Sequence, residues 1–338
     1  MYKLIGENNK VNYGSIDEPI DFNYKDFKLL NFFGKEIKGI KKKFAFHKFN
    51  YIGIIADEYL VGFAAVSLGY MHNVFAYLFD YKKGVIYEYN AIGLGDEKKL
   101  LFGVNPDEYE ISFRKGRTKL HITKSHTQGK LIVDADFEGR LKVNAIIPYN
   151  LENSKPLRVL NPSEPSRWTF TEKCSPLVPE SIGVSFEGLE LEYTNVSVLY
   201  DWSGGYLRRH TNWYWAAFSG ILPDTMQIGA NIAALVNESY FNENAFWING
   251  NRTRSHQCIF DFDVSDPYKP WRIWNEAGTI DIKFNPEGER SENINAVLIK
   301  TAFRQFVGKF SGILKPENGN SVEFSDVYGF TEYHRAKW

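Results

Sequence analysis

Side chains that could do chemistry are concentrated between Tyr200 and Gly220, where the chain reads YDWSGGYLRRHTNWYWAAFSG. No other run of the sequence combines an acid, three basic residues and three tryptophans in this way. A carboxyl group or an imidazole can donate and accept a proton, so Asp201, His210 and the more distant His256 are the candidate catalytic residues. Each histidine could equally be a hydrogen-bonded structural residue.

The same run, together with one residue beyond it, supplies the predicted ligand-binding residues. Ligand pockets are mostly apolar with a few placed polar groups, and this run has that composition. We therefore predict the polar end of an aromatic-lined cavity. Its ligand contacts are expected from Trp202, Tyr206, Arg208, Arg209, Trp213, Trp215 and Asn231.

The elements that would position these side chains are a turn and a strand. Asp, Ser and Gly favour turns, which predicts a turn over residues 200–205. Residues 206–218 alternate imperfectly, as a strand would, with an arginine beside aromatic residues on each face. A buried arginine needs a partner, so we expect Asp201 to pair with Arg208 or Arg209. A purely structural salt bridge under an aromatic layer stays open as the alternative.

This run resembles the central signature of the bacterial family known as domain of unknown function 2804. The early run from Tyr51 to Tyr81, QFVGKFSG from Gln305 and the closing GFTEYHRAKW from Gly329 resemble other motifs of that family, so the likeness covers nearly the whole chain. By fold, the family is more distantly similar to carotenoid-hydratase-like and Diels–Alderase-like proteins. That likeness implies two lipocalin-like antiparallel β-barrels, or strongly curved β-sandwiches, in tandem, with few short helices.

Local patterns also favour an all-β chain. Four short segments between Glu110 and Ile147 are separated by glycine-containing turns, which is typical of an antiparallel barrel or sandwich. Proline is frequent over residues 150–183 and indicates a connection. We therefore predict an N-terminal lipocalin-like domain over 1–165, a proline-rich connection with a crossover strand over 166–195, and a C-terminal lipocalin-like domain over 196–338.

Composition limits the possible partners. The 338 residues carry a net charge of −1, which argues against a nucleic-acid partner, and no segment approaches the ~20 apolar residues of a membrane span. Lys41–Lys43 is expected to be a solvated strand edge, with a phosphate or membrane contact as the alternative. We expect a monomer or a homodimer.

The spacing of the cysteines and the motifs that are missing argue against several classes of site. Cys174 and Cys258 lack the spacing of metal ligands, and no secretory signal is evident, so we expect no metal, no cofactor and a cytoplasmic location. Motifs of α/β-hydrolases and of nucleotide-binding loops are missing as well.

Three functions remain compatible with the sequence. The first is a cofactor-independent enzyme of the hydratase or dehydratase, isomerase or cyclase type, acting on a small hydrophobic or polyol-bearing molecule. The second is a non-catalytic lipid- or isoprenoid-binding protein. The third is a protein that binds or cleaves carbohydrate.

Overall fold

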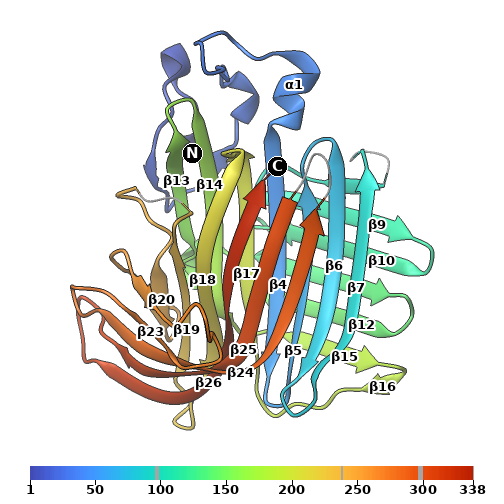
Figure 1. Cartoon of the computed structure of the whole chain (residues 1–338), viewed down its shortest axis with the longest axis vertical. Coiled ribbons are helices and arrows are strands. Elements are labelled where there is room, and N and C mark those ends of the chain that lie inside the picture. Colours follow the sequence, from blue (N-terminus) through green and yellow to red (C-terminus); the bar gives the residue numbers. More distant parts are fainter. Residues whose placement is uncertain (96–98, 237–238, 296–299, 338) are drawn as a thin grey trace.

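The computed structural model describes residues 1–95, 99–236, 239–295 and 300–337. Within these residues, the strands form three large antiparallel sheets and one short parallel pair, β1 (Tyr2–Lys3) with β3 (Ile20–Asp21). The helices are short: α1 (Gly39–Phe44), α2 (Leu151–Ser154) and two 3-10 turns (Glu7–Asn9 and Tyr24–Asp26). The chain is thus all-β, as the sequence predicts (Figure 1).

The seven-stranded sheet contains the predicted meander. Along its strands, buried apolar residues alternate with more exposed polar residues, and the connecting turns carry glycine at positive φ. Its spatial order is β16 (Leu189–Glu190), β15 (Ser181–Phe186), β12 (Leu141–Pro148), β11 (Lys130–Phe137), β10 (Thr118–Ser125), β9 (Glu108–Lys115) and β8 (Leu100–Phe102). The buried face packs on the next sheet and forms the largest hydrophobic core of the protein.

The eight-stranded sheet is the middle layer of the molecule (Figure 1). Its order is β2 (Gly14–Ser15), β13 (Leu157–Glu164), β14 (Arg167–Leu177), β17 (Val196–Tyr206), β4 (Phe46–Ala56), β5 (Tyr59–Ser67), β6 (Met71–Asp80) and β7 (Gly84–Leu94). One face packs on the seven-stranded sheet, and the other contributes to a separate apolar cluster that contains Tyr51, Leu60 and Tyr77. Central strands are consequently buried on both sides, β5 along almost all of its length.

The turn predicted over residues 200–205 is wrong, because these residues lie inside strand β17. The backbone of β17 pairs with β14 on one side and with β4 on the other. Alternation along this strand turns Tyr200 and Trp202 toward the large core, whereas Leu199 faces the second cluster and Asp201 faces the cavity described below. The chain reverses only after Tyr206.

The nine-stranded sheet forms the second half of the fold. Its order is β21 (Asn251–Arg254), β20 (Ala245–Ile248), β19 (Gln227–Ala234), β18 (His210–Ile221), β26 (Val322–Lys337), β25 (Lys300–Leu314), β24 (Ile280–Asn295), β23 (Trp271–Trp274) and β22 (Ile259–Asp261). This sheet curls around a core of its own, while one end of its long strands lies over the face of the eight-stranded sheet (Figure 1). The arrangement agrees with the predicted pair of strongly curved lipocalin-like units.

The predicted domain boundaries at residues 165 and 195 stay a prediction, and the strands of the sheets do not follow them simply. Strand β17, placed by that division in the C-terminal unit, pairs within the eight-stranded sheet. The proline-rich connection also contains a fully ordered strand, β14, most of which is buried.

Cys174 and Cys258 are buried free thiols. Among the described residues, no helix is long and apolar enough to cross a membrane.

Candidate functional site

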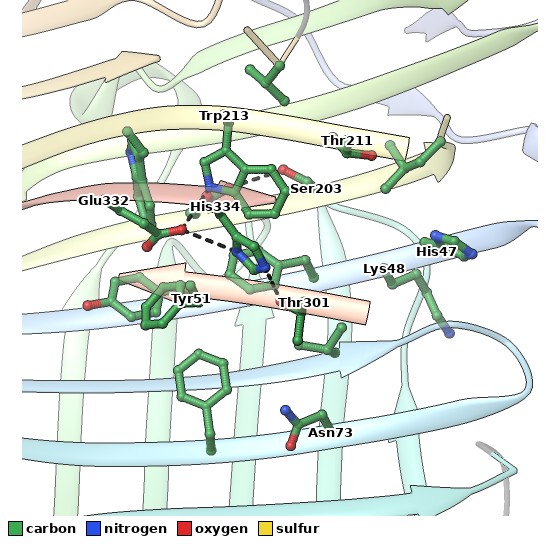
Figure 2. A pocket seen from close by; sticks show the side chains of 18 of the residues that line it. His47, Lys48, Tyr51, Asn73, Ser203, Thr211, Trp213, Thr301, Glu332 and His334 are labelled. Carbon is green, nitrogen blue, oxygen red and sulfur yellow. Dashed lines mark hydrogen bonds and ion pairs between the residues drawn. The ribbon is translucent and has the colours of Figure 1, made fainter. Parts of the chain in front are cut away.

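A cavity of about 250 Å³ lies between the eight-stranded sheet and strands β18, β24, β25 and β26. Its walls are largely aromatic and aliphatic side chains from both sheets, including Phe49, Phe75, Phe303, Trp213 and Trp215. Polar side chains gather in two clusters on this wall. One surrounds a lysine of β14, and the other, shown in Figure 2, lies at the end of β26. This composition is typical of a ligand pocket.

The first cluster is a buried lysine shared by two carboxylates. Lys173 Nζ lies 2.8 Å from Asp201 Oδ2 and 3.4 Å from Glu243 Oε2. The ammonium group also lies 4.8 Å from the centroid of the Trp215 ring, and Ser203 donates a hydrogen bond of 3.2 Å to Asp201. The cluster therefore places one cation between two acids, all three buried and all facing the cavity.

For Lys173 and for Asp201, burial and the neighbouring opposite charge shift the pKa in opposite directions. Burial disfavours the charged ammonium, but the neighbouring carboxylates of Asp201 and Glu243 outweigh it and raise the pKa of Lys173. For Asp201, burial raises the pKa of the carboxyl group, Lys173 opposes this increase, and the carboxylate of Glu243 adds to it. With Lys173 charged and both carboxyl groups ionised, the cluster carries one excess negative charge, which protonation of one carboxyl group would remove.

The second cluster is centred on Glu332 of β26. Its Oε1 accepts a 2.7 Å hydrogen bond from Trp213 Nε1 and lies 3.6 Å from His334 Nδ1, while Gln305 donates to Oε2 at 3.3 Å. The other ring nitrogen of His334 hydrogen-bonds Thr301, and the ring packs on Trp213 at a centroid distance of 4.1 Å (Figure 2). A carboxylate thus orients an imidazole at the cavity wall, an arrangement that can accept and return a proton.

Three further polar groups on the cavity wall have unused hydrogen-bonding capacity. Among the described residues, no hydrogen-bond partner is found for Gln305 Oε1, Asn73 Oδ1 or Thr169 Oγ1, all of which are buried atoms. Buried acceptors are normally satisfied. All three atoms lie around one apolar cavity and could accept further hydrogen bonds.

Sequence and structure comparisons identify the family of this chain. A profile of the family described as domain of unknown function, DUF2804, matches residues 22–338. The chain belongs to this family. The resemblance of its motifs to that family is therefore confirmed. None of the curated proteins compared with the chain matches it.

The chain is also similar to solved structures. The protein CghA, solved with Sch210972, is similar over 99% of this chain and 96% of its own, with 9% identity and a TM-score of 0.52. Kievitone hydratase from Nectria haematococca is similar over 85% of this chain and 88% of its own, with 14% identity and a TM-score of 0.48. At such low identity, the likeness to CghA shows a shared fold.

In this family member, the cavity is lined by only some of the residues that the sequence predicts for the site. Asp201, Trp213 and Trp215 line it. Asn231 lies behind the wall, where it accepts from Trp215 Nε1 at 2.7 Å and donates to the backbone oxygen of Glu243 at 2.7 Å. Its placement supports the first cluster rather than contacting the cavity.

The other predicted site residues lie elsewhere. Trp202 and Tyr206 are part of the large core on the opposite face of β17. Arg208 donates to the backbone oxygen of Val236, and the expected pairing of Asp201 with Arg208 or Arg209 is wrong because Lys173, on the neighbouring strand, takes that place. The remaining three predicted residues are exposed and do not line the cavity: Arg209, His210 and His256.

The ionisable residues of the two clusters that the sequence does not predict are Lys173, Glu243, Glu332 and His334. Glu332 and His334 are two positions apart, a spacing that puts both on one face of a strand, so this signal was present in the closing motif. Lys173 sits in the proline-rich stretch that the sequence predicts to be a connection, and Glu243 lies in a bend. Nothing in their local sequence predicts that they meet Asp201.

A third buried polar cluster lies apart from this cavity, in the core between the seven- and eight-stranded sheets. Asp107, His126 and Glu172 offer ligand atoms within 4.8 Å of one another, as a metal site would. However, Arg158 pairs with both carboxylates, and Lys124 pairs with Glu172. These two cations already neutralise the acids, so the cluster does not favour a metal ion.

Proposed function

We propose that this protein is a cofactor-independent enzyme of the hydratase, isomerase or cyclase type, and that the cavity between the two halves is its active site. The observation that carries this proposal is the buried Lys173 shared by Asp201 and Glu243 on the wall of an aromatic cavity. Two acids around one cation favour a retained proton, and a retained proton facing an apolar pocket is what general acid catalysis needs.

Each cluster has a role in this proposal. Asp201 acts as the general acid that protonates a carbon–carbon double bond or a leaving hydroxyl group of the substrate. The aromatic faces of Trp213 and Trp215 stabilise positive charge that develops on the substrate. Glu332 and His334 accept the proton that is released from the attacking water or from the carbon that is deprotonated. These roles replace those predicted for His210 and His256, which are exposed.

The cavity wall supports a proposal for the class of substrate. A small, largely apolar molecule fits the aromatic and aliphatic surface, and one or more hydroxyl groups would satisfy the unpartnered acceptors of Gln305, Asn73 and Thr169. We retain the cytoplasm as the proposed location, since the two cysteines are free and buried. Binding without catalysis is the second candidate, because the salt bridges of Asp201 would also serve a purely structural role.

The decisive experiment compares three purified proteins: wild type, Asp201→Asn and Asp134→Asn. Asp134 lies on the seven-stranded sheet, outside the cavity, and is a matched control. Each protein is incubated with a metabolite and lipid extract of its source cells, and mass spectrometry follows every species. We expect one species to gain or lose water, or to isomerise, with wild type and Asp134→Asn, and its rate to fall about 10²–10⁴-fold with Asp201→Asn.

Two outcomes would contradict this proposal. If Asp201→Asn turns the species over at the wild-type rate, Asp201 is not the general acid. If nothing turns over but one compound co-purifies equally with all three proteins, the cavity belongs to a binding protein.

A further inference from the structure

One end of the molecule carries a tight, exposed loop with two aromatic side chains at its tip. Phe32 is 96% exposed and Phe33 is 81% exposed, and their rings contact one another edge to face. The loop is held rigidly, because Asn31 Oδ1 accepts hydrogen bonds from the backbone N–H groups of Phe33 and Lys35, at 3.0 and 2.9 Å. Two largely exposed phenylalanines side by side on one loop are unusual on a protein surface that faces only water.

The segment around this loop is strongly basic. Residues 25–43 contain seven lysines against Asp26 and Glu36, a balance of +5, although the whole chain has a net charge of −1. The rest of the protein is therefore acidic, and positive charge is concentrated beside the exposed aromatic tip. Helix α1 continues the pattern with Lys41, an exposed lysine, next to Ile40, which is 65% exposed. We call residues 25–44 the basic tip.

The basic tip adjoins the candidate active site. Helix α1 leads into β4, whose His47 and Lys48 line the cavity. The turn between β5 and β6 packs against the same helix, with the rings of Phe44 and Tyr70 5.8 Å apart. At the end of β7, Leu94 is 85% exposed beside its strand partner Met71, a cavity residue. In Figure 1, α1 lies beyond the ends of these strands, at the end of the molecule that carries the label C.

Basic residues from the run between Tyr200 and Gly220 lie at the same end of the molecule as the basic tip. Arg209 and His210 are exposed in the turn and strand that follow β17. Burial raises the pKa of Tyr70 and the positive charge of Arg209 opposes this increase, so Arg209 lies near the turn that packs on α1. These basic residues do not line the cavity. They extend the positive surface of the basic tip.

We propose that this end of the protein docks on the surface of an anionic lipid bilayer. Phe32 and Phe33 insert at the level of the lipid headgroups, and the surrounding lysines contact acidic phospholipids. This combination of an apolar wedge with basic flanks is what interfacial binding requires, since hydrophobic insertion and electrostatic attraction add. A nucleic-acid duplex would use the charges but not the exposed phenylalanines, and the net charge of −1 argues against a single strand whose bases would stack on them. The exposed tip offers a wedge rather than a groove for another protein.

Docking in this orientation would bring the cavity close to molecules dissolved in the bilayer. The inference does not depend on the proposed reaction, because none of its residues belongs to the two polar clusters of the cavity. A failure of membrane binding and a failure of catalysis are therefore separately measurable.

The test is co-sedimentation of the full-length protein with lipid vesicles. Vesicles of phosphatidylcholine alone are compared with vesicles in which about 30% of the lipid is phosphatidylserine. We expect wild type to bind only the anionic vesicles, and more weakly as salt is added. Phe32→Ser with Phe33→Ser should lower the partition coefficient at least about tenfold.

Charge is tested by removing exposed lysines. The triple change Lys28→Gln, Lys35→Gln and Lys41→Gln should lower partitioning roughly a hundredfold, since each lysine near an anionic surface contributes about a factor of five. Matched controls, Leu189→Ser and Lys115→Gln, change an exposed apolar and an exposed basic residue on the distant seven-stranded sheet and should bind like wild type.

Three results would overturn the proposal. The first is no binding of wild type to anionic vesicles, and the second is binding that the phenylalanine and lysine substitutions leave unchanged. The third is concentration-dependent dimerisation in sedimentation velocity that Phe32→Ser with Phe33→Ser abolishes, because the tip would then be an interface between two copies of the chain.

Discussion

Lys173 is the residue on which the first cluster depends. Its ammonium group is buried between Asp201 and Glu243, so Lys173→Met would leave two carboxylates without their cation. Removing one partner of a buried ion pair costs about 3–5 kcal/mol. We expect a loss of that size in the free energy of unfolding, measured by urea titration at pH 7.

A surface lysine provides the control for this prediction. Lys119 pairs with Asp134 on a partly exposed face of the seven-stranded sheet, and such pairs contribute about 0–1 kcal/mol. Lys119→Met should therefore be nearly neutral. Equal losses for the two variants would mean that Lys173 is not held as a buried cation.

His126 makes a prediction about acid stability. Burial, together with the charge of Lys124, lowers the pKa of His126 from 6.5 to about 4. Between these values the unfolded chain binds a proton that the folded chain does not, so stability falls as the pH drops from 6.5 to 4. The full effect of this shift is on the order of 3 kcal/mol. The charged groups facing the imidazole are those of Lys124, Arg158, Asp107, Glu108 and Glu172.

Urea titrations at several pH values test this prediction. His126→Gln should lose less stability than wild type between pH 6.5 and 4, although His47, whose pKa burial also lowers to about 4, keeps part of the dependence. His121→Gln is the control, because His121 is exposed and paired with Glu110. If His126→Gln and wild type lose stability in parallel, His126 is protonated in the folded protein.

At the scale of elements, strands with regular alternation are predicted correctly from the sequence, whereas part of strand β17 is predicted as a turn. The meander over residues 108–148 was found because apolar alternation and glycine turns agree there. In β17, Gly204 and Gly205 suggested a turn, but the reason for Gly205 is a close approach. A Cβ atom at this position would lie 2.3 Å from the backbone oxygen of Trp168 in β14. One sequence cannot distinguish these two uses of glycine.

A second close approach gives a prediction for the long curved strands. Gly329 of β26 lies opposite Gly308 of β25, and a Cβ atom on Gly329 would meet the backbone oxygen of Ala217 at 2.3 Å. Gly329→Ala must therefore push β26 away from β18, at a cost of about 1–3 kcal/mol. Thermal and urea unfolding measure this loss.

Gly183 supplies the matched control in another strand. An added Cβ there would find its nearest neighbour, Glu190 Oε2, at 4.0 Å, and its φ is ordinary for an L residue. Gly183→Ala should be neutral or slightly stabilising, by up to about 1 kcal/mol, because alanine restricts the unfolded chain. A stable Gly329→Ala variant would show that β18 and β26 can separate freely.

At the scale of the whole molecule, the candidate site exists only because two sheets meet. Lys173 comes from β14, Asp201 from β17, and Glu332 with His334 from the last strand. The family resemblance predicted a pair of lipocalin-like units, and local alternation predicted most of their strands. The placement of one unit over the face of the other depends on contacts between residues far apart in sequence, so three of these four residues were not predicted as site residues.

The same meeting of sheets predicts how the protein unfolds. Phe330 of β26 is fully buried between the two halves, where its ring lies 5.8 Å from that of Tyr51 and 4.8 Å from that of Trp215. Phe330→Ala leaves a cavity in this interface, at a cost of about 3–5 kcal/mol. Each half also has a hydrophobic core of its own. We therefore expect the substitution to weaken the coupling of the halves and to split a single unfolding transition into two.

Phe137→Ala is the control, because Phe137 is equally buried but lies inside the core between the seven- and eight-stranded sheets. It should lower stability by a similar amount while the two probes, far-ultraviolet circular dichroism and tryptophan fluorescence, still report coincident urea transitions. With Phe330→Ala, the two probes should separate, because the tryptophans of the two halves then unfold at different urea concentrations. Coincident transitions for both variants would show that other contacts, such as the hydrogen bond from Ser175 of β14 to the backbone oxygen of Phe218 in β18, join the halves. The interface beside the cavity would then contribute little to their coupling.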